Sequence, residues 1–302
     1  MYTSPAVPRT PTVTVLAVGG TGESYQGDSR TEVTGMLGHV VGELDGRFAA
    51  RWIGYPSSYG PVPFGTGLSY ADSVTLGVDA LLRAVADTPG PVMLLGYSQG
   101  AVVVRRMLGL VADGSLHAPH IVAAGLISDP HRPEGTDPRC DGYGVAGRGP
   151  YVPESVEVLW VSNPDDVICN ASGDSFVRDL ADATESLAVR DLKRWVPSAL
   201  ARYRRGLFQN AAKTAFSRRQ WVRDIRRVRT AVDEVRGYLP SLQLGARTVN
   251  AGGGRHVAYA AEPYQLRRYE DEALTGCQVL AQWLQVQATF RGRLSSSETT
   301  DG

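Results

Sequence analysis

The chain has 302 residues, and its 31 basic and 31 acidic side chains give a formal net charge of zero. Hydrophobic residues make up 43 % of the chain and charged residues 21 %, a composition that is typical of globular proteins and excludes an intrinsically disordered chain. The balanced charge also excludes a protein whose whole surface is basic, so we expect no nucleic-acid partner.

Three cysteines, Cys140, Cys169 and Cys277, are too few for a scaffold built on disulfides. They have no zinc-site spacing with one another or with histidines, so we expect no metal site. The N-terminal residues lack the apolar core of a signal peptide, and no stretch approaches the roughly 18 apolar residues of a membrane-spanning helix. We therefore expect a soluble protein made without a signal peptide.

The first half of the chain alternates short apolar runs with amphipathic segments. The predicted strands are residues 13–18, 48–54, 92–96, 121–127 and 156–161, and the predicted helices are residues 33–45, a segment that begins at Ser69 and stops before Pro89, and residues 100–111. Such alternation predicts an α/β fold with a parallel sheet covered by helices on both faces. In these sheets the working residues follow the carboxyl ends of the strands.

The pattern changes after residue 175. Residues 175–236 are compatible with helices and show no strand pattern, and a last helix is predicted over residues 264–290. We therefore expect a catalytic domain formed by residues 1–174 and 245–302, interrupted by a helical insertion at residues 175–244.

One pentapeptide has the pattern of a catalytic turn. Residues 96–100 read Gly-Tyr-Ser-Gln-Gly, between a predicted strand and a predicted helix. This Gly-x-Ser-x-Gly context predicts a nucleophile elbow that exposes the hydroxyl of Ser98 above the sheet. The two glycines are needed because the turn leaves no room for larger side chains.

A serine nucleophile needs a histidine base. His39 lies in a predicted helix, and His117 and His120 precede a strand, at the wrong edge of the sheet. His131 and His256 remain, and only His256 completes the order Ser, Asp, His of α/β-hydrolases. We favour His256 and keep His131 as the alternative.

The third member of the triad is a carboxylate that orients the histidine. Asp165 and Asp166 follow the strand 156–161, and Asp129 follows the strand before it. All three occupy strand ends, so the spacing alone leaves them open.

An oxyanion hole should combine the backbone N–H of Gln99 with one from the glycine-rich loop after the first strand, residues 20–23. That loop fits neither the phosphate-binding pattern of P-loop proteins nor the dinucleotide-binding pattern. We expect no cofactor.

Several segments together resemble the cutinase-type serine esterases of the α/β-hydrolase fold, and within them the phage lysin B mycolylarabinogalactan esterases. The resemblance extends over roughly residues 12–290 and rests on five segments in order: VLAVGGTGES, YPSSYG, GYSQG, NPDDVIC and GGRHVAYA. The segment SDPHRPEG and the helical insertion are also similar to those lysins.

The resemblance implies specific roles. Asp166 fits the Asp-x-x-Cys pattern of cutinases better than Asp165 does, and Thr21 falls where the family has its second oxyanion residue. Cutinases have a cysteine where Ser162 stands, so their local disulfide is absent, and Cys140 is left as a conceivable partner of Cys169. The implied reaction is hydrolysis of the ester between mycolic acids and arabinogalactan.

The implied biological role is release of the outer envelope at the end of phage infection, by a protein made in the host cytoplasm. A general cutinase or lipase, or an acyltransferase, is the alternative activity. A non-catalytic protein that binds cell-wall lipid is a more remote one.

The zero net charge hides an uneven distribution. Residues 189–236 contain 14 basic and 4 acidic side chains, so this segment carries +10 and the rest of the chain −10. The charges either form ordinary solvated helix faces or approach an anionic cell-wall or membrane surface. The apolar residues between them, such as Phe208, Phe216 and Trp221, either pack on the catalytic domain or form a wall of a lipid groove.

Overall fold

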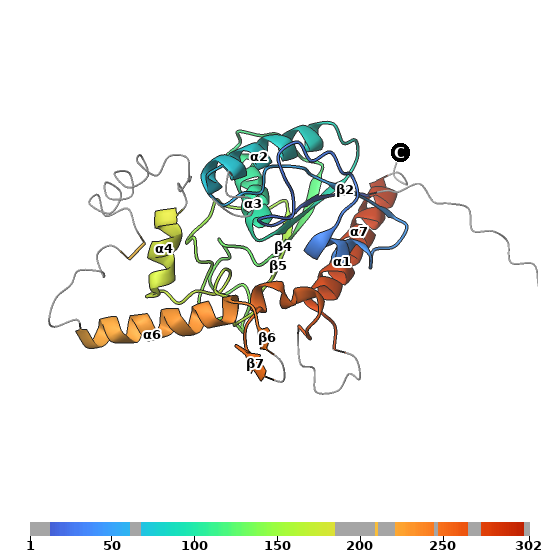
Figure 1. The fold of residues 1–302 in the computed structure, drawn as a ribbon. Coiled ribbons are helices and arrows are strands. Elements are labelled where there is room, and N and C mark those ends of the chain that lie inside the picture. The colour runs from blue at the N-terminus through green and yellow to red at the C-terminus, as the bar shows by residue number, and fades with distance from the viewer. Residues whose placement is uncertain are drawn as a thin grey trace, which may run out of the picture.

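The computed structural model describes residues 13–60, 68–184, 209–210, 221–244, 247–264 and 273–298. A five-stranded sheet lies at its centre, with all strands parallel and in the order β2-β1-β3-β4-β5 (Figure 1). Its strands are β1 (Val13–Val18), β2 (Phe48–Trp52), β3 (Val92–Tyr97), β4 (Ile121–Ile127) and β5 (Glu157–Val161). The predicted parallel sheet is therefore confirmed.

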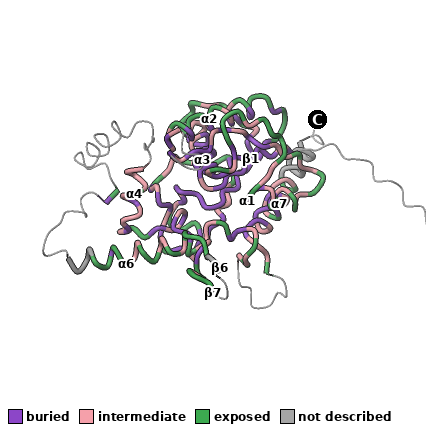
Figure 2. The backbone as a smooth tube through the Cα atoms, viewed as in Figure 1, coloured by how far each residue is buried: buried purple, intermediate pink, exposed green. Residues whose placement is uncertain are grey.

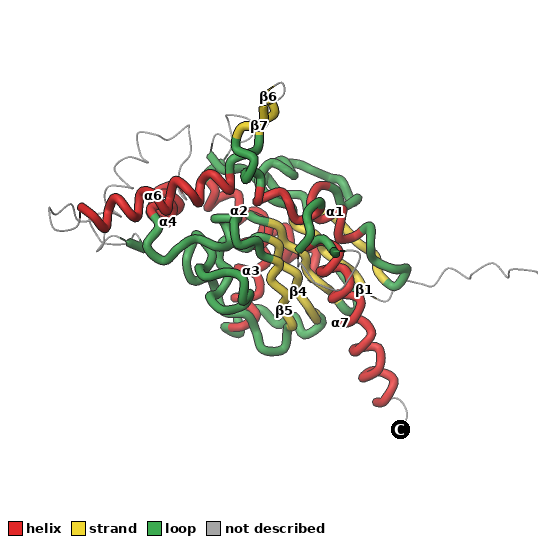
Figure 3. Tube along the Cα trace, turned by 90° about the horizontal axis from the view of Figure 1, so that it is seen from below, coloured by secondary structure: helices red, strands yellow, loops and turns green. Residues whose placement is uncertain are grey.

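Two pairs of helices cover the two faces of this sheet. One face packs on α2 (Tyr70–Ala86) and α3 (Gln99–Ala112), and the other on α1 (Gly35–Val41) and α7 (Gly276–Glu298). The alternation of side chains along each strand supplies both cores. In β1, Leu16 packs toward α2 and α3, whereas Val15 packs toward α1 and α7. Figure 2 shows the buried strands between their helices, and Figure 3 shows the sheet from below.

Helix α2 begins as its sequence predicts. The hydroxyl of Ser69 accepts a hydrogen bond from the backbone N–H of Asp72 at 3.1 Å, which satisfies one of the free donors of the first turn. Several boundaries differ from prediction. Helix α1 covers only residues 35–41 of the predicted 33–45, β2 ends at Trp52, and the last helix begins at Gly276 instead of residue 264.

The segment between β5 and α7 contains helices and also a hairpin. Helices α4 (Phe176–Thr184) and α6 (Trp221–Tyr238) contact each other, and α6 extends away from the sheet (Figure 1). A short antiparallel hairpin, β6 (Leu242–Leu244) and β7 (Arg247–Val249), follows and was not predicted. It crosses the predicted boundary at residues 244–245. A 3₁₀-helix, η3 (Arg255–Ala260), then leads back to the sheet.

Several predictions concern parts of the insertion that the structure does not describe. Residues 185–208 and 211–220, which hold most of the predicted basic residues together with Phe208 and Phe216, lie outside the described residues. Within the described part of the chain, no helix combines the length and apolar composition that crossing a membrane requires.

Candidate active site

The turn from β3 into α3 has the geometry of a nucleophile elbow. Ser98 stands between the two elements with φ +52° and ψ −115°, a backbone conformation that non-glycine residues rarely adopt. Its two flanking glycines are required by close packing. A Cβ atom on Gly100 would lie 2.0 Å from the carbonyl oxygen of Val18, and one on Gly96 would lie 2.6 Å from the Cα atom of Ala101. The strain therefore serves to present the Ser98 hydroxyl at the start of a helix.

The structure brings Ser98, His256 and Asp166 together at the carboxyl edge of the sheet. The Nε2 atom of His256 lies 3.0 Å from Ser98 Oγ, and its Nδ1 atom lies 3.0 Å from Asp166 Oδ2. Ser98 follows β3, Asp166 lies in the loop after β5, and His256 is in η3. These distances are those of a nucleophile, a base and an orienting acid.

The carboxylate of Asp166 is fully buried and densely hydrogen-bonded. Ser128 and Tyr259 donate their hydroxyl protons to Oδ2, at 2.5 and 2.7 Å, and the backbone N–H of Ile168 donates to Oδ1 at 3.1 Å. Burial alone would raise the pKa of Asp166, but the charge of His256 and these hydrogen bonds outweigh it and lower the pKa. Asp166 is therefore held as a carboxylate.

The other two candidate acids have different surroundings. Asp165 is exposed, and its backbone N–H bonds to the Asn163 side chain in a local turn. Asp129 is buried and accepts a hydrogen bond from the indole of Trp160 at 3.0 Å, while its Oδ2 atom lies 3.7 Å from Arg105 Nε.

The alternative base, His131, is also engaged elsewhere. Its Nδ1 atom lies 3.1 Å from the backbone oxygen of Gly147, within the long loop between β4 and β5. The structure does not bring His131 to Ser98: the imidazole that contacts Ser98 Oγ is that of His256.

The loop after β1 lies beside the nucleophile. A Cβ atom on Gly20 would be 3.3 Å from Ser98 Cβ, and the hydroxyl of the next residue, Thr21, donates to Gln99 Oε1 at 3.1 Å. The Gln99 amide in turn donates to the backbone oxygen of Ser58 at 3.0 Å. The two residues predicted for the oxyanion hole are thus in direct contact.

A carboxylate fixes the loop after β1 to α1. Glu23 accepts hydrogen bonds from the backbone N–H of Gly20 at 2.7 Å and from that of Met36, in the first turn of α1, at 2.9 Å. One carboxylate oxygen of Glu23 binds the loop and the other binds α1, which keeps the backbone near Ser98 in place.

Two tyrosines hold His256 in place. The Tyr97 hydroxyl donates to the backbone oxygen of His256 at 2.9 Å, and the two rings stack with centroids 5.3 Å apart. The ring of Tyr238, at the end of α6, lies 5.3 Å from the same imidazole at an angle of 43°. The end of the helical insertion therefore contacts the active site.

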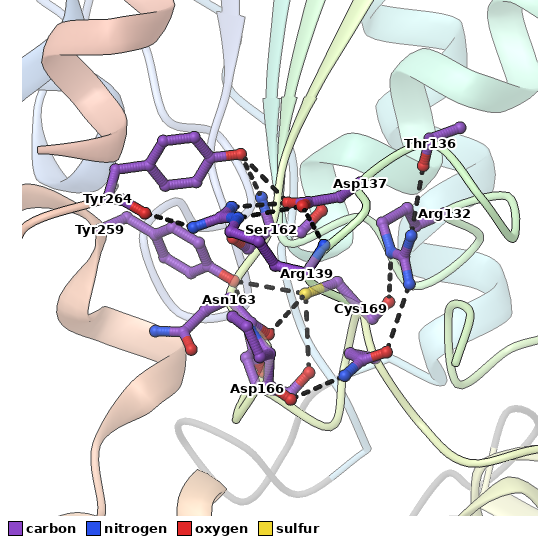
Figure 4. A network of polar contacts seen from close by, with 12 residues as sticks. Arg132, Thr136, Asp137, Arg139, Ser162, Asn163, Asp166, Cys169, Tyr259 and Tyr264 are labelled. Atoms are coloured by element: carbon purple, nitrogen blue, oxygen red, sulfur yellow. Dashed lines mark hydrogen bonds and ion pairs between the residues drawn. The ribbon is translucent and has the colours of Figure 1, made fainter. Parts of the chain in front are cut away.

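Three arginines hold the loop that carries Asp166, and of these Arg132 and Arg178 are buried. Arg132 donates from Nε to the backbone oxygen of Cys169 at 2.7 Å, and Arg139 donates to the backbone oxygen of Ser162 at 2.9 Å (Figure 4). Arg178 of α4 donates to the backbone oxygens of Ala171 and Ser172. These guanidinium groups connect the acid loop to the β4–β5 loop and to α4.

The cysteines are unpaired. Cys140, Cys169 and Cys277 are all free and buried, so the conceivable bond between Cys140 and Cys169 is absent from the structure. The Sγ atom of Cys169 instead lies 3.4 Å from the Tyr259 hydroxyl, next to Asp166 (Figure 4). In the part of the chain that the structure describes, no group of three or more His, Cys, Asp or Glu residues could hold a metal ion.

Sequence reasoning missed Ser128, Tyr259 and Tyr238 as neighbours of the triad. Ser128 did carry a signal, because it follows β4 directly at the edge where the working residues gather. Tyr259 lies three residues after His256, and nothing in its local pattern marks it as a partner of Asp166.

A comparison with protein families matches one part of the chain. The family model of the PE-PPE domain matches residues 47–152, which include the nucleophile elbow. No curated protein sequence matches the chain.

Several solved structures are similar to the chain. An acetyl xylan esterase is 22 % identical, with a TM-score of 0.42, and the match covers 63 % of this chain and 99 % of that one. A cutinase-like protein from Cryptococcus sp. is 18 % identical, with a TM-score of 0.39, and the match covers 65 % of this chain and 92 % of that one. A lipase-esterase related protein from Clostridium acetobutylicum ATCC 824 is 16 % identical, with a TM-score of 0.28, and the match covers 42 % of this chain and 46 % of that one.

The parallel sheet, the strained serine turn and the ordered Ser, Asp and His are those of an α/β-hydrolase, so the predicted fold class is confirmed. Its site holds a serine, a histidine and an aspartate in the arrangement of a nucleophile, a base and an orienting acid.

Proposed function

We propose that the protein is a serine esterase that cleaves the ester between mycolic acids and arabinogalactan, and that it acts in phage lysis. The observation that carries the esterase part is the hydrogen-bonded chain from Ser98 through His256 to Asp166. The substrate and the biological role rest on the resemblance to phage lysin B esterases.

The reaction follows from the geometry. His256 Nε2 takes the proton of Ser98 as Oγ attacks the ester carbonyl, and Asp166 stabilises the resulting imidazolium. The backbone N–H groups of Gln99 and Thr21 stabilise the oxyanion of the tetrahedral intermediate. His256 then donates the proton to the leaving alcohol, and a water molecule activated in the same way releases the acid from Ser98.

Exposed apolar side chains near His256 support a lipid substrate. Val257, next to the base, is 62 % exposed, and Tyr238 and Leu239, at the end of α6, are 43 % and 49 % exposed. Apolar side chains gathered beside an active site are typical of sites that bind apolar partners. An acyl chain of a mycolate would cover this surface.

Helix α6 supports contact with an anionic surface of the cell envelope. Ile225, Val228 and Val232 are 45–51 % exposed and share one helix face. Arg226 and Arg229 are exposed beside them. A basic and apolar helix face of this kind binds interfaces that carry negative charge. The protein would be made in the host cytoplasm and would reach this surface at the end of infection.

Active-site labelling tests the esterase. A fluorophosphonate should label Ser98 of the folded protein, and the Ser98→Ala variant should stay unlabelled. Absence of label on the native protein would overturn the proposal at its first step, and leave a protein that binds cell-wall lipid without cleaving it.

Purified mycolyl-arabinogalactan tests the substrate. Free mycolate should appear with the native protein and not with Ser98→Ala. Turnover of short soluble esters without release of mycolate would favour the general cutinase or lipase. Transfer of the acyl group to an added sugar, in place of its release, would favour the acyltransferase.

Charge reversal tests the surface. Arg226→Glu combined with Arg229→Glu should reduce activity on whole cell wall more than activity on a small soluble ester. Arg227 is unsuitable for this test, although it belongs to the same basic segment. Its side chain is buried on Phe176 and donates to the backbone oxygen of Asp174. Equal losses on both substrates would refute contact with the envelope.

A further inference from the structure

Ser128 occupies an unusual position beside the triad. It follows β4 directly, is fully buried, and has φ +52°. Glycine adopts this backbone conformation freely, whereas a residue with a side chain incurs a cost in free energy. We therefore expect the contacts of the Ser128 side chain to offset this cost.

Those contacts join the acid and the base of the proposed triad. Ser128 Oγ donates its proton to Asp166 Oδ2 at 2.5 Å, and the same oxygen lies 3.0 Å from His256 Nδ1. Because the hydroxyl proton is used on the carboxylate, only the oxygen lone pairs face the imidazole. The Nδ1 atom must then carry a proton, shared between Ser128 and Asp166.

A protonated Nδ1 atom leaves the other ring nitrogen of a neutral imidazole as an acceptor. That nitrogen, Nε2, lies 3.0 Å from Ser98 Oγ. We propose that Ser128 is a positioning residue, whose hydroxyl holds His256 in the tautomer and ring orientation that can accept the proton of Ser98. The inference rests on the proposed esterase function and adds a fourth side chain to its machinery.

The other polar groups around the pair act differently. The Tyr97 hydroxyl is used on the backbone of His256, and Tyr238 contacts the imidazole through its ring. Tyr259 donates to the same carboxylate oxygen as Ser128, and Cys169 lies behind Tyr259. Among the described residues, Ser128 is the neutral side chain with hydrogen bonds to both Asp166 and His256 Nδ1. Tyr259 therefore provides a matched control, because its hydroxyl reaches only the acid.

The experiment compares Ser128→Ala, Ser128→Gly and Tyr259→Phe on a soluble ester. Both Ser128 variants should lose about tenfold or more in kcat, the expected effect of one hydrogen bond to a charged group, with little change in KM. Tyr259→Phe should lose less. Ser128→Gly should be more stable than Ser128→Ala, because both lose the hydroxyl but only the glycine variant removes the strain at φ +52°.

A second readout needs no substrate. In ¹H NMR of the resting protein, the Nδ1 proton of His256 should give a resolved downfield resonance that shifts or exchanges faster in both Ser128 variants, and less so in Tyr259→Phe. Native kcat in Ser128→Gly, or an unchanged resonance, would overturn the inference. A native protein that shows the resonance but hydrolyses no ester would contradict the esterase function and leave the role of Ser128 in orienting His256 intact.

Discussion

Replacing Asp166 by asparagine tests the acid at the centre of the site. The carboxylate accepts hydrogen bonds from Ser128, Tyr259, His256 and the backbone N–H of Ile168, so both oxygens face donors. Asparagine has one acceptor oxygen and an NH₂ group. Its best arrangement keeps the oxygen on the N–H of Ile168, whose proton cannot turn away.

The NH₂ group then takes the place of Oδ2 and faces Ser128, Tyr259 and His256. These three groups donate to Oδ2 in the native protein and must accept from the NH₂ group in the variant. The two hydroxyls can rotate to accept, but His256 can accept only by giving up the proton on Nδ1. Its remaining proton moves to Nε2, which faces Ser98 Oγ. An imidazole in that tautomer cannot act as the base, and the loss in kcat from a wrong tautomer is about 10⁴-fold in the serine protease triad.

Steady-state hydrolysis of a soluble chromogenic ester measures this loss, with circular dichroism as the check on folding. Asp165→Asn is the matched control, because its exposed side chain lies one residue away and its substitution should leave kcat unchanged. A kcat of Asp166→Asn within tenfold of the native value would refute the assignment of Asp166 as the orienting acid.

Three further outcomes are expected. Glu23→Gln should lower kcat by about 10- to 100-fold through a displaced oxyanion loop, because one acceptor oxygen cannot hold two backbone N–H groups; native kcat would contradict this. Arg178→Met should lower the free energy of unfolding in urea by about 3 kcal/mol or more, because it strands buried carbonyl oxygens; Arg236→Met, at an exposed side chain, is the control and should change little. The lowered pKa of Asp166 contributes stability that is present above its ordinary pKa of 3.8 and lost as pH falls toward the lower folded-state pKa, so the native protein should lose more stability than Asp166→Asn below about pH 4.

The strands could be predicted well because buried parallel strands are short continuous apolar runs. The bounds of β1 and β4 agree with the sequence pattern residue by residue. The hairpin β6–β7 was missed because three-residue strands are too short to show an alternation. Helix α1 was predicted too long because its apolar spacing continues to Leu44, whereas the chain turns after Val41.

The proposed triad could be predicted from the sequence because each member follows a strand or a glycine-rich segment in a known order. The side chains that hydrogen-bond to the triad could not be predicted. Tyr259 and Ser128 meet at Asp166 from segments 131 residues apart, and only the fold brings them together. Arg178 lies in the predicted helical insertion but outside its basic segment, and nothing in the sequence marks its guanidinium as buried among backbone oxygens.

The position of α7 has a consequence for folding during synthesis. One face of the sheet is completed by Cys277, Leu280 and Leu284, which the ribosome makes long after the strands that they cover. Until they emerge, the apolar side chains of β1 and β3 on that face have only α1 as cover, and a nascent chain in this state is prone to aggregate. His256 is also made late, so a nascent chain that already contains Ser98 lacks its base. An enzyme with this topology would become active only after the segment that carries His256 and α7 has been translated.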